Sequence, residues 1–281
     1  MAIINIFPGD SWTTKFNTSA VGDTINIKTG VHREQTGSPK ANQIVLFEKG
    51  AVANGSRVFS SWTVAGATWY TTGVSRSVQQ VETIGAFTPS QPGYRAAWNI
   101  DVYIDNVPQV HVTTEAAVTS GTFWYNPSNS RVYIGINPSG KVVEVSYTVF
   151  CLNSGEDGIT IKGGLVEKYA CQRQNAALDF EQGTNTLIEN VTVQLCHWKG
   201  AAANQGSRFI NCRFLRMGQM GFGGTGNILV QGCETAYNNY AKFEENFEAG
   251  GCKIGNSFQA VLRSNWAHHN NGPALWLDIN N

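Results

Sequence analysis

Two acidic residues and one lysine near the end of the sequence have the types and the spacing that catalysis needs. Asp278 ends the segment 274–278, and Lys253 ends the similar segment 249–253. If both segments are strands of consecutive coils, the two residues share one column, and Glu181 lies farther back in it. Neighbouring strands are about 4.8 Å apart, so side chains in one column are close together. The alternative is a purely structural ion pair between Lys253 and Asp278.

A second carboxyl group stacked one coil away from Asp278 would lie at about this strand spacing. Two carboxyl groups so placed are expected to hydrolyse a glycosidic bond. Retaining enzymes hold the two groups about 5–5.5 Å apart, whereas inverting enzymes hold them about 6.5–9.5 Å apart. A carboxylate one coil after Asp278 would therefore favour retention, with Asp278 as the nucleophile. The sequence stops at Asn281, partway through a coil. We therefore expect either that the chain is a fragment, lacking that carboxylate, or that a partner or a second copy covers its last coil.

A second group of carboxylates occupies the longest segment between two repeats, where Glu244, Glu245 and Glu248 alternate with Tyr240 and Phe247. Carboxylates bind sugar hydroxyls and aromatic rings stack on sugar faces, so the segment is expected to bind a neutral saccharide. Apolar neighbours disfavour the charged form of a carboxyl group, and we expect Glu248 to act as a general acid for that reason. The alternative is a solvated loop whose aromatic side chains only pack on the coil below.

Two further residues are candidates for substrate binding. Trp276, two positions before Asp278, is expected to stack on a sugar, although tryptophan on a strand more often packs in a core. His269, at a corner between strands, could orient a carboxylate, with a hydrogen bond to the backbone as the alternative. Neither a histidine-rich cluster nor a calcium-binding Asp-x-Asp loop is present, so we expect no metal and no cofactor.

The elements that position these residues form an internal repeat. Similar short segments, rich in β-branched residues, glycine and asparagine, occur at 158–165, 186–193, 207–214, 227–234 and 259–266. Equating Ile161, Ile188, Ile210, Val230 and Leu262 gives a period in the low twenties, apart from two longer steps. A period of this size without a helical pattern predicts one strand-built coil per repeat, stacked as a parallel β-solenoid. Function is expected on the loops and on the faces they border.

The repeat is interrupted once, which divides the chain into three parts. Residues 1–57 are expected to form the first coils with a short capping helix from Trp12 to Ala20. Residues 58–149 contain alternating strands rich in aromatic residues and hairpin turns, which predicts an inserted antiparallel β-sandwich. The solenoid resumes at residue 150 and continues to residue 281.

Composition limits the classes of partner. The chain has 20 basic and 20 acidic residues, and only 14% of its residues are charged, so no basic field exists to recruit nucleic acid or a membrane surface. No signal peptide or transmembrane segment is apparent, and the localisation stays open among the cytoplasm, a phage particle and a piece of an exported protein. Six cysteines without a secretion signal are expected to be reduced, with Cys212 and Cys233 stacked in the core one coil apart.

The whole chain resembles the carbohydrate-active right-handed parallel β-helix proteins, and in particular the β-helical β-xylosidases with an inserted β-sandwich. The segments that carry the resemblance are 8–11, 22–25, 30–34, 105–107, 123–126, 131–134, 247–253 and 269–278. The resemblance implies an all-β fold and a polysaccharide ligand. Members of the group continue through further coils after the Trp-Leu-Asp segment, and one of these coils supplies another carboxylate.

These observations favour polysaccharide recognition and, in a complete chain, glycoside hydrolysis near Glu248, Lys253 and Asp278. One alternative is a non-catalytic adhesin or phage structural protein, because β-helices serve many functions. A second alternative is a pectate lyase-like enzyme acting on uronates, with Lys253 as the base and Arg263 as its partner. The near-zero net charge argues against the lyase.

Overall fold

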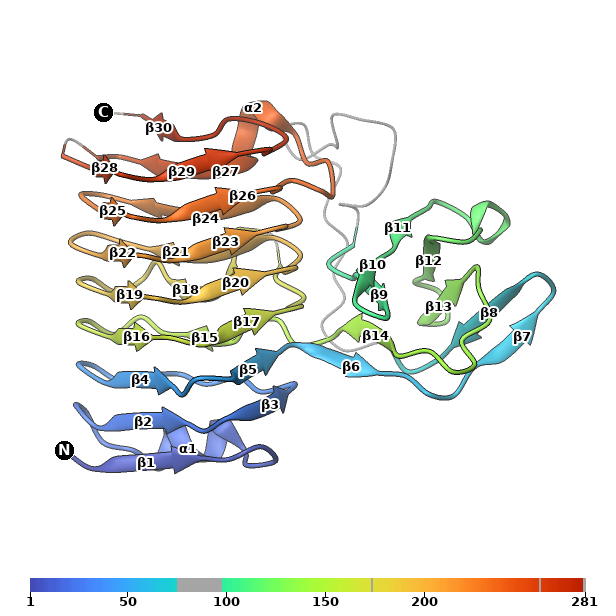
Figure 1. The fold of residues 1–281 in the computed structure, drawn as a ribbon, viewed down its shortest axis with the longest axis horizontal. Coiled ribbons are helices and arrows are strands. Elements are labelled where there is room, and N and C mark those ends of the chain that lie inside the picture. Colours follow the sequence, from blue (N-terminus) through green and yellow to red (C-terminus); the bar gives the residue numbers. More distant parts are fainter. Residues whose placement is uncertain (75–97, 173, 258, 280–281) are drawn as a thin grey trace.

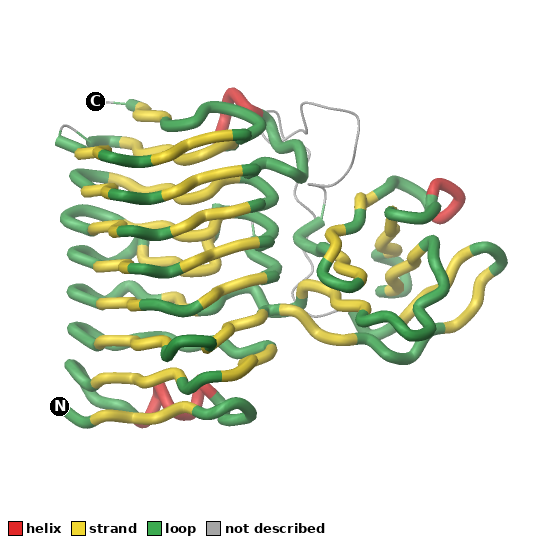
Figure 2. Tube along the Cα trace, in the orientation of Figure 1, coloured by secondary structure: helices red, strands yellow, loops and turns green. Residues whose placement is uncertain are grey.

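The computed structural model describes residues 1–74, 98–172, 174–257 and 259–279. Within them the chain folds as a parallel β-solenoid with a smaller β domain inserted at its side (Figure 1). The predicted all-β fold with parallel coils is confirmed. Figure 2 shows the strands stacked in columns and joined by loops at the corners. Among the described residues, no helix is both long and apolar enough to cross a membrane.

Three parallel sheets, which we name A, B and C, form the walls of the solenoid. Sheet A contains β1 (Ile3–Ile6), β2 (Thr24–Ile27), β4 (Ile44–Phe47), β16 (Thr160–Lys162), β19 (Leu187–Glu189), β22 (Arg208–Ile210), β25 (Leu229–Gln231) and β28 (Val261–Arg263). Sheet B contains β3 (Gly30–Arg33), β5 (Ala51–Asn54), β17 (Leu165–Glu167), β20 (Thr192–Gln194), β23 (Arg213–Leu215), β26 (Glu234–Ala236) and β29 (Trp266–His268). Sheet C contains β15 (Leu152–Asn153), β18 (Ala176–Phe180), β21 (Lys199–Ala203), β24 (Met220–Thr225), β27 (Gly250–Gly255) and β30 (Trp276–Asp278).

The predicted register of sheet A is confirmed except at one position. Ile161 pairs with Ile188, and Val230 pairs with Leu262, as the repeat predicts. The residue between Ile188 and Val230 is Phe209 rather than Ile210. The predicted position was wrong by one residue because Ile210 is also apolar, but its side chain is half-buried while Phe209 is fully buried in the core.

Stacked side chains fill the interior of the solenoid. Cys212 and Cys233 are buried one coil apart, and the Cys212 amide donates to the Cys233 sulfur at 3.4 Å. This is the stacking that the 21-residue spacing predicts. Phe209, Phe214 and Phe222 come from the three sheets of one coil, and their ring centroids are 5.0–5.9 Å apart. Residues of successive coils therefore join in one continuous core.

Helix α1 (Trp12–Thr18) covers the N-terminal end of the core, as predicted. Ser11 caps the helix by accepting a hydrogen bond from the amide of Thr14. Trp12 and Phe16 are buried in the main core cluster. The Trp12 indole also donates to Nδ1 of His32 at 3.3 Å, so the helix is tied to sheet B as well as packed on the first coil.

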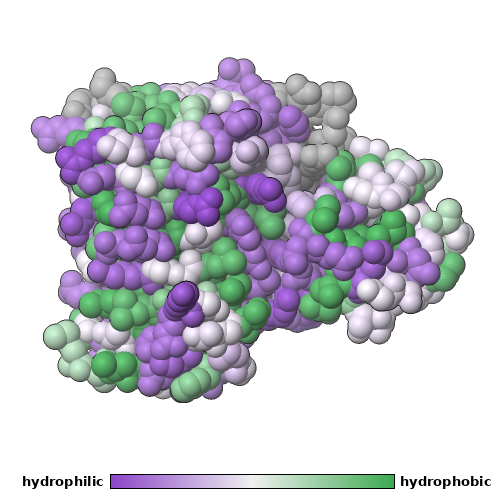
Figure 3. Space-filling view, in the orientation of Figure 1, coloured by the Kyte–Doolittle hydropathy of each residue, from purple (hydrophilic) through white to green (hydrophobic). Residues whose placement is uncertain are grey.

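The inserted domain connects β5 to β15 and has two sheets. Sheet D contains β6 (Ser56–Val58), β9 (Val102–Ile104), β10 (Val107–Pro108) and β14 (Val143–Ser146). Sheet E contains β7 (Thr63–Ala65), β8 (Thr68–Thr71), β11 (Val110–His111), β12 (Thr122–Asn126) and β13 (Arg131–Ile134), and a short 3-10 helix covers Glu115–Ala117. Residues of both sheets share one apolar cluster, which is separate from the core of the solenoid. Figure 3 shows polar and apolar residues intermixed over one face of the molecule.

Candidate functional site

The outer face of sheet C collects charged side chains from several coils. Side chains alternate along each strand. In β18, Leu178 and Phe180 belong to the core cluster, which leaves Asp179 between them on the outer face. On neighbouring strands, Asp179 lies opposite Ala202 of β21, and Lys253 of β27 lies opposite Trp276 of β30. This outer column thus contains both charged and small residues.

Lys253 and Asp278 are close together, but not in the register that the sequence predicts. Asp278 pairs with Gly255, and the residue opposite Lys253 is Trp276. The lysine side chain is long enough to reach the diagonal neighbour, and its Nζ lies 3.0 Å from Oδ2 of Asp278. The ion pair that the sequence offered as an alternative is therefore present. The prediction that Lys253 and Asp278 lie directly opposite each other in one column is wrong, because the observed register differs from the predicted one by two residues.

Lys253 has further partners that fix its position. Its Nζ donates to the carbonyl oxygen of Phe247 at 2.8 Å. It also lies 4.5 Å from the ring centroid of Trp276 and 5.2 Å from that of Phe247. Cations are attracted to ring faces at such distances. Asp278, Trp276 and Phe247, which the sequence analysis nominated separately, are thus brought together around one ammonium group.

Lys199 organises a second charged group on the same face. Its Nζ lies 3.1 Å from Oε1 of Glu181, and its side chain is almost fully buried. Burial disfavours the charged form of Lys199, but the carboxylates of Glu181 and Glu248 outweigh this effect and raise its pKa above the ordinary value. Asp179 also contributes to the field at Lys199. Three carboxyl groups therefore surround one buried lysine.

Asp179 is a weaker acid than an exposed aspartate. It is only 7% exposed, and burial raises its pKa above the ordinary value, against the hydrogen bond donated by the amide of Ala176. The carboxylate of Glu181 raises the pKa further. Asp179 therefore keeps its proton at higher pH than an exposed aspartate does, which is the property a general acid requires.

Glu248 is the last residue of the short helix α2 (Glu245–Glu248). Its Oε2 atom is buried and accepts no hydrogen bond from the residues that the structure describes. Glu248 acts on Lys199 electrostatically, while the preceding residue, Phe247, accepts the hydrogen bond from Lys253. Helix α2 thus contributes one residue to each charged group. A buried carboxylate oxygen without a hydrogen-bond partner is rare in folded proteins.

The other residues of the predicted loop have local roles in the structure. Glu244 is the N-cap of α2 and accepts hydrogen bonds from the amide and the side chain of Asn246. Glu245 begins the helix. Tyr240 is oriented away from this loop, since its buried hydroxyl lies beside Asp101 of the inserted domain. The loop therefore does not gather all the predicted binding residues on one surface.

His269 lies at a corner after sheet B and is likewise separate from the two charged groups. Its ring stacks on Tyr237 with a centroid distance of 4.9 Å, and its Nδ1 is 2.7 Å from Nδ1 of His268. His268 in turn contacts Glu234 at 3.3 Å and stacks on the exposed Trp266. In the described part of the chain, no three His, Cys, Asp or Glu side chains are grouped to hold a metal ion.

The lysine and the arginine considered for a uronate lyase lie on different sheets. Lys253 is on β27 of sheet C, whereas Arg263 is on β28 of sheet A. The Arg263 guanidinium binds Oε1 of Gln231 on its own sheet, at 2.6 and 2.9 Å. The two cations thus belong to different walls of the solenoid, and each has partners of its own.

Comparison with known proteins agrees with this architecture. Residues 176–281 match the family model described as "Right handed beta helix region". A solved structure titled "The complex structure of XylC with xylose" has a TM-score of 0.70 and 15% sequence identity, and the match covers 96% of this chain and 57% of that one. The chain is a right-handed parallel β-helix. It spans little more than half the length of that structural neighbour.

A second solved structure, titled "Glycoside hydrolase", has a TM-score of 0.38 and 11% identity over 86% of this β-helix and 66% of that chain. This likeness is too weak to carry an argument. No match was found among curated proteins.

Asp179 and Lys199 of this β-helix were not predicted from the sequence, and Glu181 was predicted only as a more distant member of the column. The available signal was a charge inside an apolar run, because Asp179 lies between Leu178 and Phe180. A charge in such a run must be on the outer face or paired. Lys199 follows Trp198 and precedes a run of small residues, so it could be recognised in the same way.

Proposed function

We propose that this β-helix recognises a polysaccharide on the outer face of sheet C and hydrolyses it with carboxyl groups there. The observation that carries the proposal is the environment of Lys199. A carboxyl group with a raised pKa, Asp179, and a carboxylate with an unpartnered buried oxygen, Glu248, both interact with this lysine. Glycoside hydrolysis requires one carboxyl group that donates a proton and one that is ionised.

In this proposal Asp179 donates a proton to the leaving-group oxygen, and Glu248 acts on the anomeric carbon directly or through a water molecule. The ammonium group of Lys199 places a positive charge near Glu248, and Glu181 forms an ion pair with the same ammonium group. The assignment of Asp278 as the nucleophile, which the sequence favours, is the second arrangement. Its ion pair with Lys253 weighs against it, because a bound ammonium group lowers the nucleophilicity of the carboxylate.

The group around Lys253 is proposed to bind the sugar rather than to cleave it. Trp276 and Phe247 offer ring faces, and the Asp278 carboxylate accepts hydrogen bonds from hydroxyl groups. The XylC structural neighbour was solved with xylose, and a xylose polymer is therefore the first substrate to test. Glucose and arabinose polymers provide the comparison.

The decisive experiment measures reducing-sugar release from these polymers by the wild-type chain and by Glu248→Gln, Asp179→Asn and Asp278→Asn. If the first two variants lose activity by about 100- to 10,000-fold without losing thermal stability, Glu248 and Asp179 supply the acid and base chemistry. Glu189→Gln is the matched control, because Glu189 also pairs with a lysine, Lys162, at 2.8 Å, but on sheet A.

Other outcomes separate the alternatives. Loss of activity only in Asp278→Asn would assign the nucleophile to Asp278 and overturn the Asp179–Glu248 pair. Binding of polysaccharide without release of sugar by the wild-type chain would favour a binding protein. Neither binding nor release from any of the polymers would contradict the carbohydrate function as a whole.

A further inference from the structure

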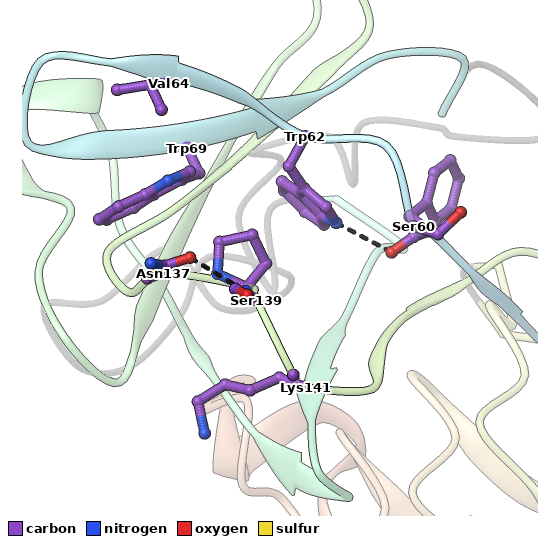
Figure 4. Close-up of a pocket in the computed structure, with 10 residues that line it drawn as sticks. Ser60, Trp62, Val64, Trp69, Asn137, Ser139 and Lys141 are labelled. Carbon is purple, nitrogen blue, oxygen red and sulfur yellow. Dashed lines mark hydrogen bonds between the residues drawn. The ribbon is translucent and has the colours of Figure 1, made fainter.

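The inserted domain contains a cavity of about 440 Å³ that lies outside the solenoid (Figure 4). It is bordered by residues before and within the β7–β8 hairpin and by the turn between β13 and β14, and these lining residues are Phe59, Ser60, Trp62, Val64, Trp69 and residues 137–141. A volume of this size falls within the range of small-molecule binding sites, which is about 300–1,000 Å³.

Two tryptophans supply the apolar walls of this cavity and are fixed in place. The Trp62 indole donates to the carbonyl oxygen of Phe59 at 2.8 Å. Trp69 lies on β8, where it pairs with Val64 on one side and Ile134 on the other. Both indoles pack against the apolar cluster between sheets D and E while remaining half-buried. Their ring faces are therefore held in position before any ligand binds, which lowers the entropy cost of binding.

The opposite side of the cavity is polar but carries no free charge. Oδ1 of Asn137 accepts a hydrogen bond from the amide of Ser139 at 3.0 Å, which orients the side chain of Asn137. Lys141, the cation that borders the cavity, forms an ion pair with Asp105 at 3.2 Å. Figure 4 shows Asn137 and Ser139 across the cavity from Trp62 and Trp69.

This combination selects the chemistry of the ligand. Indole faces bind apolar C–H surfaces, and the amide and hydroxyl groups bind hydroxyls. An anionic ligand gains little, because Asp105 already neutralises Lys141. A purely apolar ligand would leave the polar groups of the turn without partners. A neutral saccharide has both an apolar ring face and a hydroxyl edge.

We propose that this cavity binds one or two units of a neutral saccharide, so that the inserted domain is a second carbohydrate-binding site beside sheet C. The choice of saccharide as the ligand class rests on the proposed function, whereas the cavity and its walls are independent of it. The domain would hold a polysaccharide chain near the solenoid while the outer face of sheet C acts on it.

The test is isothermal titration calorimetry of the full chain with neutral xylo- and gluco-oligosaccharides and with an oligogalacturonate. The variants are Trp62→Ala, Trp69→Ala and Asn137→Ala in the cavity and Trp276→Ala on sheet C. Trp124→Ala is the matched control, because Trp124 is also a half-buried tryptophan of sheet E but borders a different cavity. Circular dichroism of each variant checks that it is folded, and Asn137→Ala leaves both indoles in place.

We expect two binding sites for a neutral oligosaccharide in the wild-type chain and about tenfold weaker binding at one of them in each cavity variant. Trp276→Ala should weaken only the other site. If the cavity variants bind like the wild type while Trp276→Ala loses binding, the second site is wrong and the proposed function stands. Preference for the oligogalacturonate, or loss of binding in Trp124→Ala alone, would also overturn the inference. Absence of all binding contradicts both proposals.

Discussion

Lys168 of the solenoid forms a buried ion pair with Glu144 of the inserted domain. Each of these two residues is 1% exposed to solvent. The second oxygen of Glu144 accepts hydrogen bonds from Arg33 at 2.7 Å and from Ser56 at 2.9 Å. Lys168 also donates to Asn106 of the inserted domain at 2.6 Å. A buried carboxylate with this many partners fixes how the inserted domain sits on the solenoid.

Removing the charge of Glu144 should therefore destabilise the whole chain. In Glu144→Gln, Lys168 is left buried without its counter-ion, and the expected loss in the free energy of unfolding is about 3 kcal/mol. Chemical denaturation monitored by circular dichroism measures it. Lys162→Gln, which breaks a more exposed pair with Glu189, is the control and should cost less than about 1 kcal/mol. Equal losses in the two variants would contradict the special role of Glu144.

The same carboxylate predicts how stability depends on pH. Burial opposes the ionisation of Glu144, but hydrogen bonds from Lys168 and Arg33 outweigh burial and hold its pKa below the ordinary value of 4.5. Its contribution to stability is therefore present above pH 4.5 and is lost as the pH falls through the lower, folded-state pKa. Melting temperatures measured between pH 7 and pH 3 should fall more steeply in the wild type than in Glu144→Gln. Parallel curves would contradict this linkage.

The effect of Asp179 on stability should depend on pH in the opposite direction. Its pKa is raised by burial in the folded chain, so the folded state binds more protons and stability decreases as the pH rises from 3.8. Asp179→Asn removes this cost and should stabilise the chain by about 1 kcal/mol at pH 7 while activity is lost. Thermal denaturation at pH 7 and pH 4 tests it, since the gain should shrink at the lower pH. A variant that is destabilised at pH 7 would show that Asp179 has a structural role.

The ion pair between Lys253 and Asp278 can be measured by a double-mutant cycle. Lys253→Ala, Asp278→Ala and the double variant should give a coupling energy of up to about 1 kcal/mol, because both side chains are partly exposed. Urea denaturation supplies the free energies. A coupling near zero would mean that Lys253 is held mainly by Phe247 and Trp276.

The two-residue error at Asp278 has a physical reason. Side chains alternate with a period of two, so a slip of one residue moves apolar side chains to the outer face and is detected in the sequence. A slip of two residues keeps every side chain on its face. The pattern of apolar residues therefore predicts that Lys253 and Asp278 share the outer face of sheet C, but it cannot tell whether they are directly opposite or diagonal.

The backbone conformations at the corners between strands could also be predicted from the sequence only in part. Asn190 and Asn211 adopt left-handed backbone conformations, with φ of 56° and 53°, as stacked corner asparagines should. In a later coil the left-handed residue is Ser264, and Asn265 instead bonds to the amide of Cys233. The site around Lys199 was missed for a related reason. Asp179 and Glu181 come from one coil, whereas Lys199 and Glu248 come from others, and the four side chains meet only when the strands stack.

The entry and exit strands of the inserted domain have an evolutionary consequence. β6 and β14 are antiparallel neighbours with Ser56 opposite Ser146, so the chain leaves the solenoid and returns to it at adjacent points. Insertions whose ends are close together add little loop-closure entropy. The backbone of the solenoid can therefore accept a domain of different length at this point without shifting its coils, provided that Lys168 keeps a buried counter-ion. The insertion can thus change in sequence and length while the stacked strands stay unchanged.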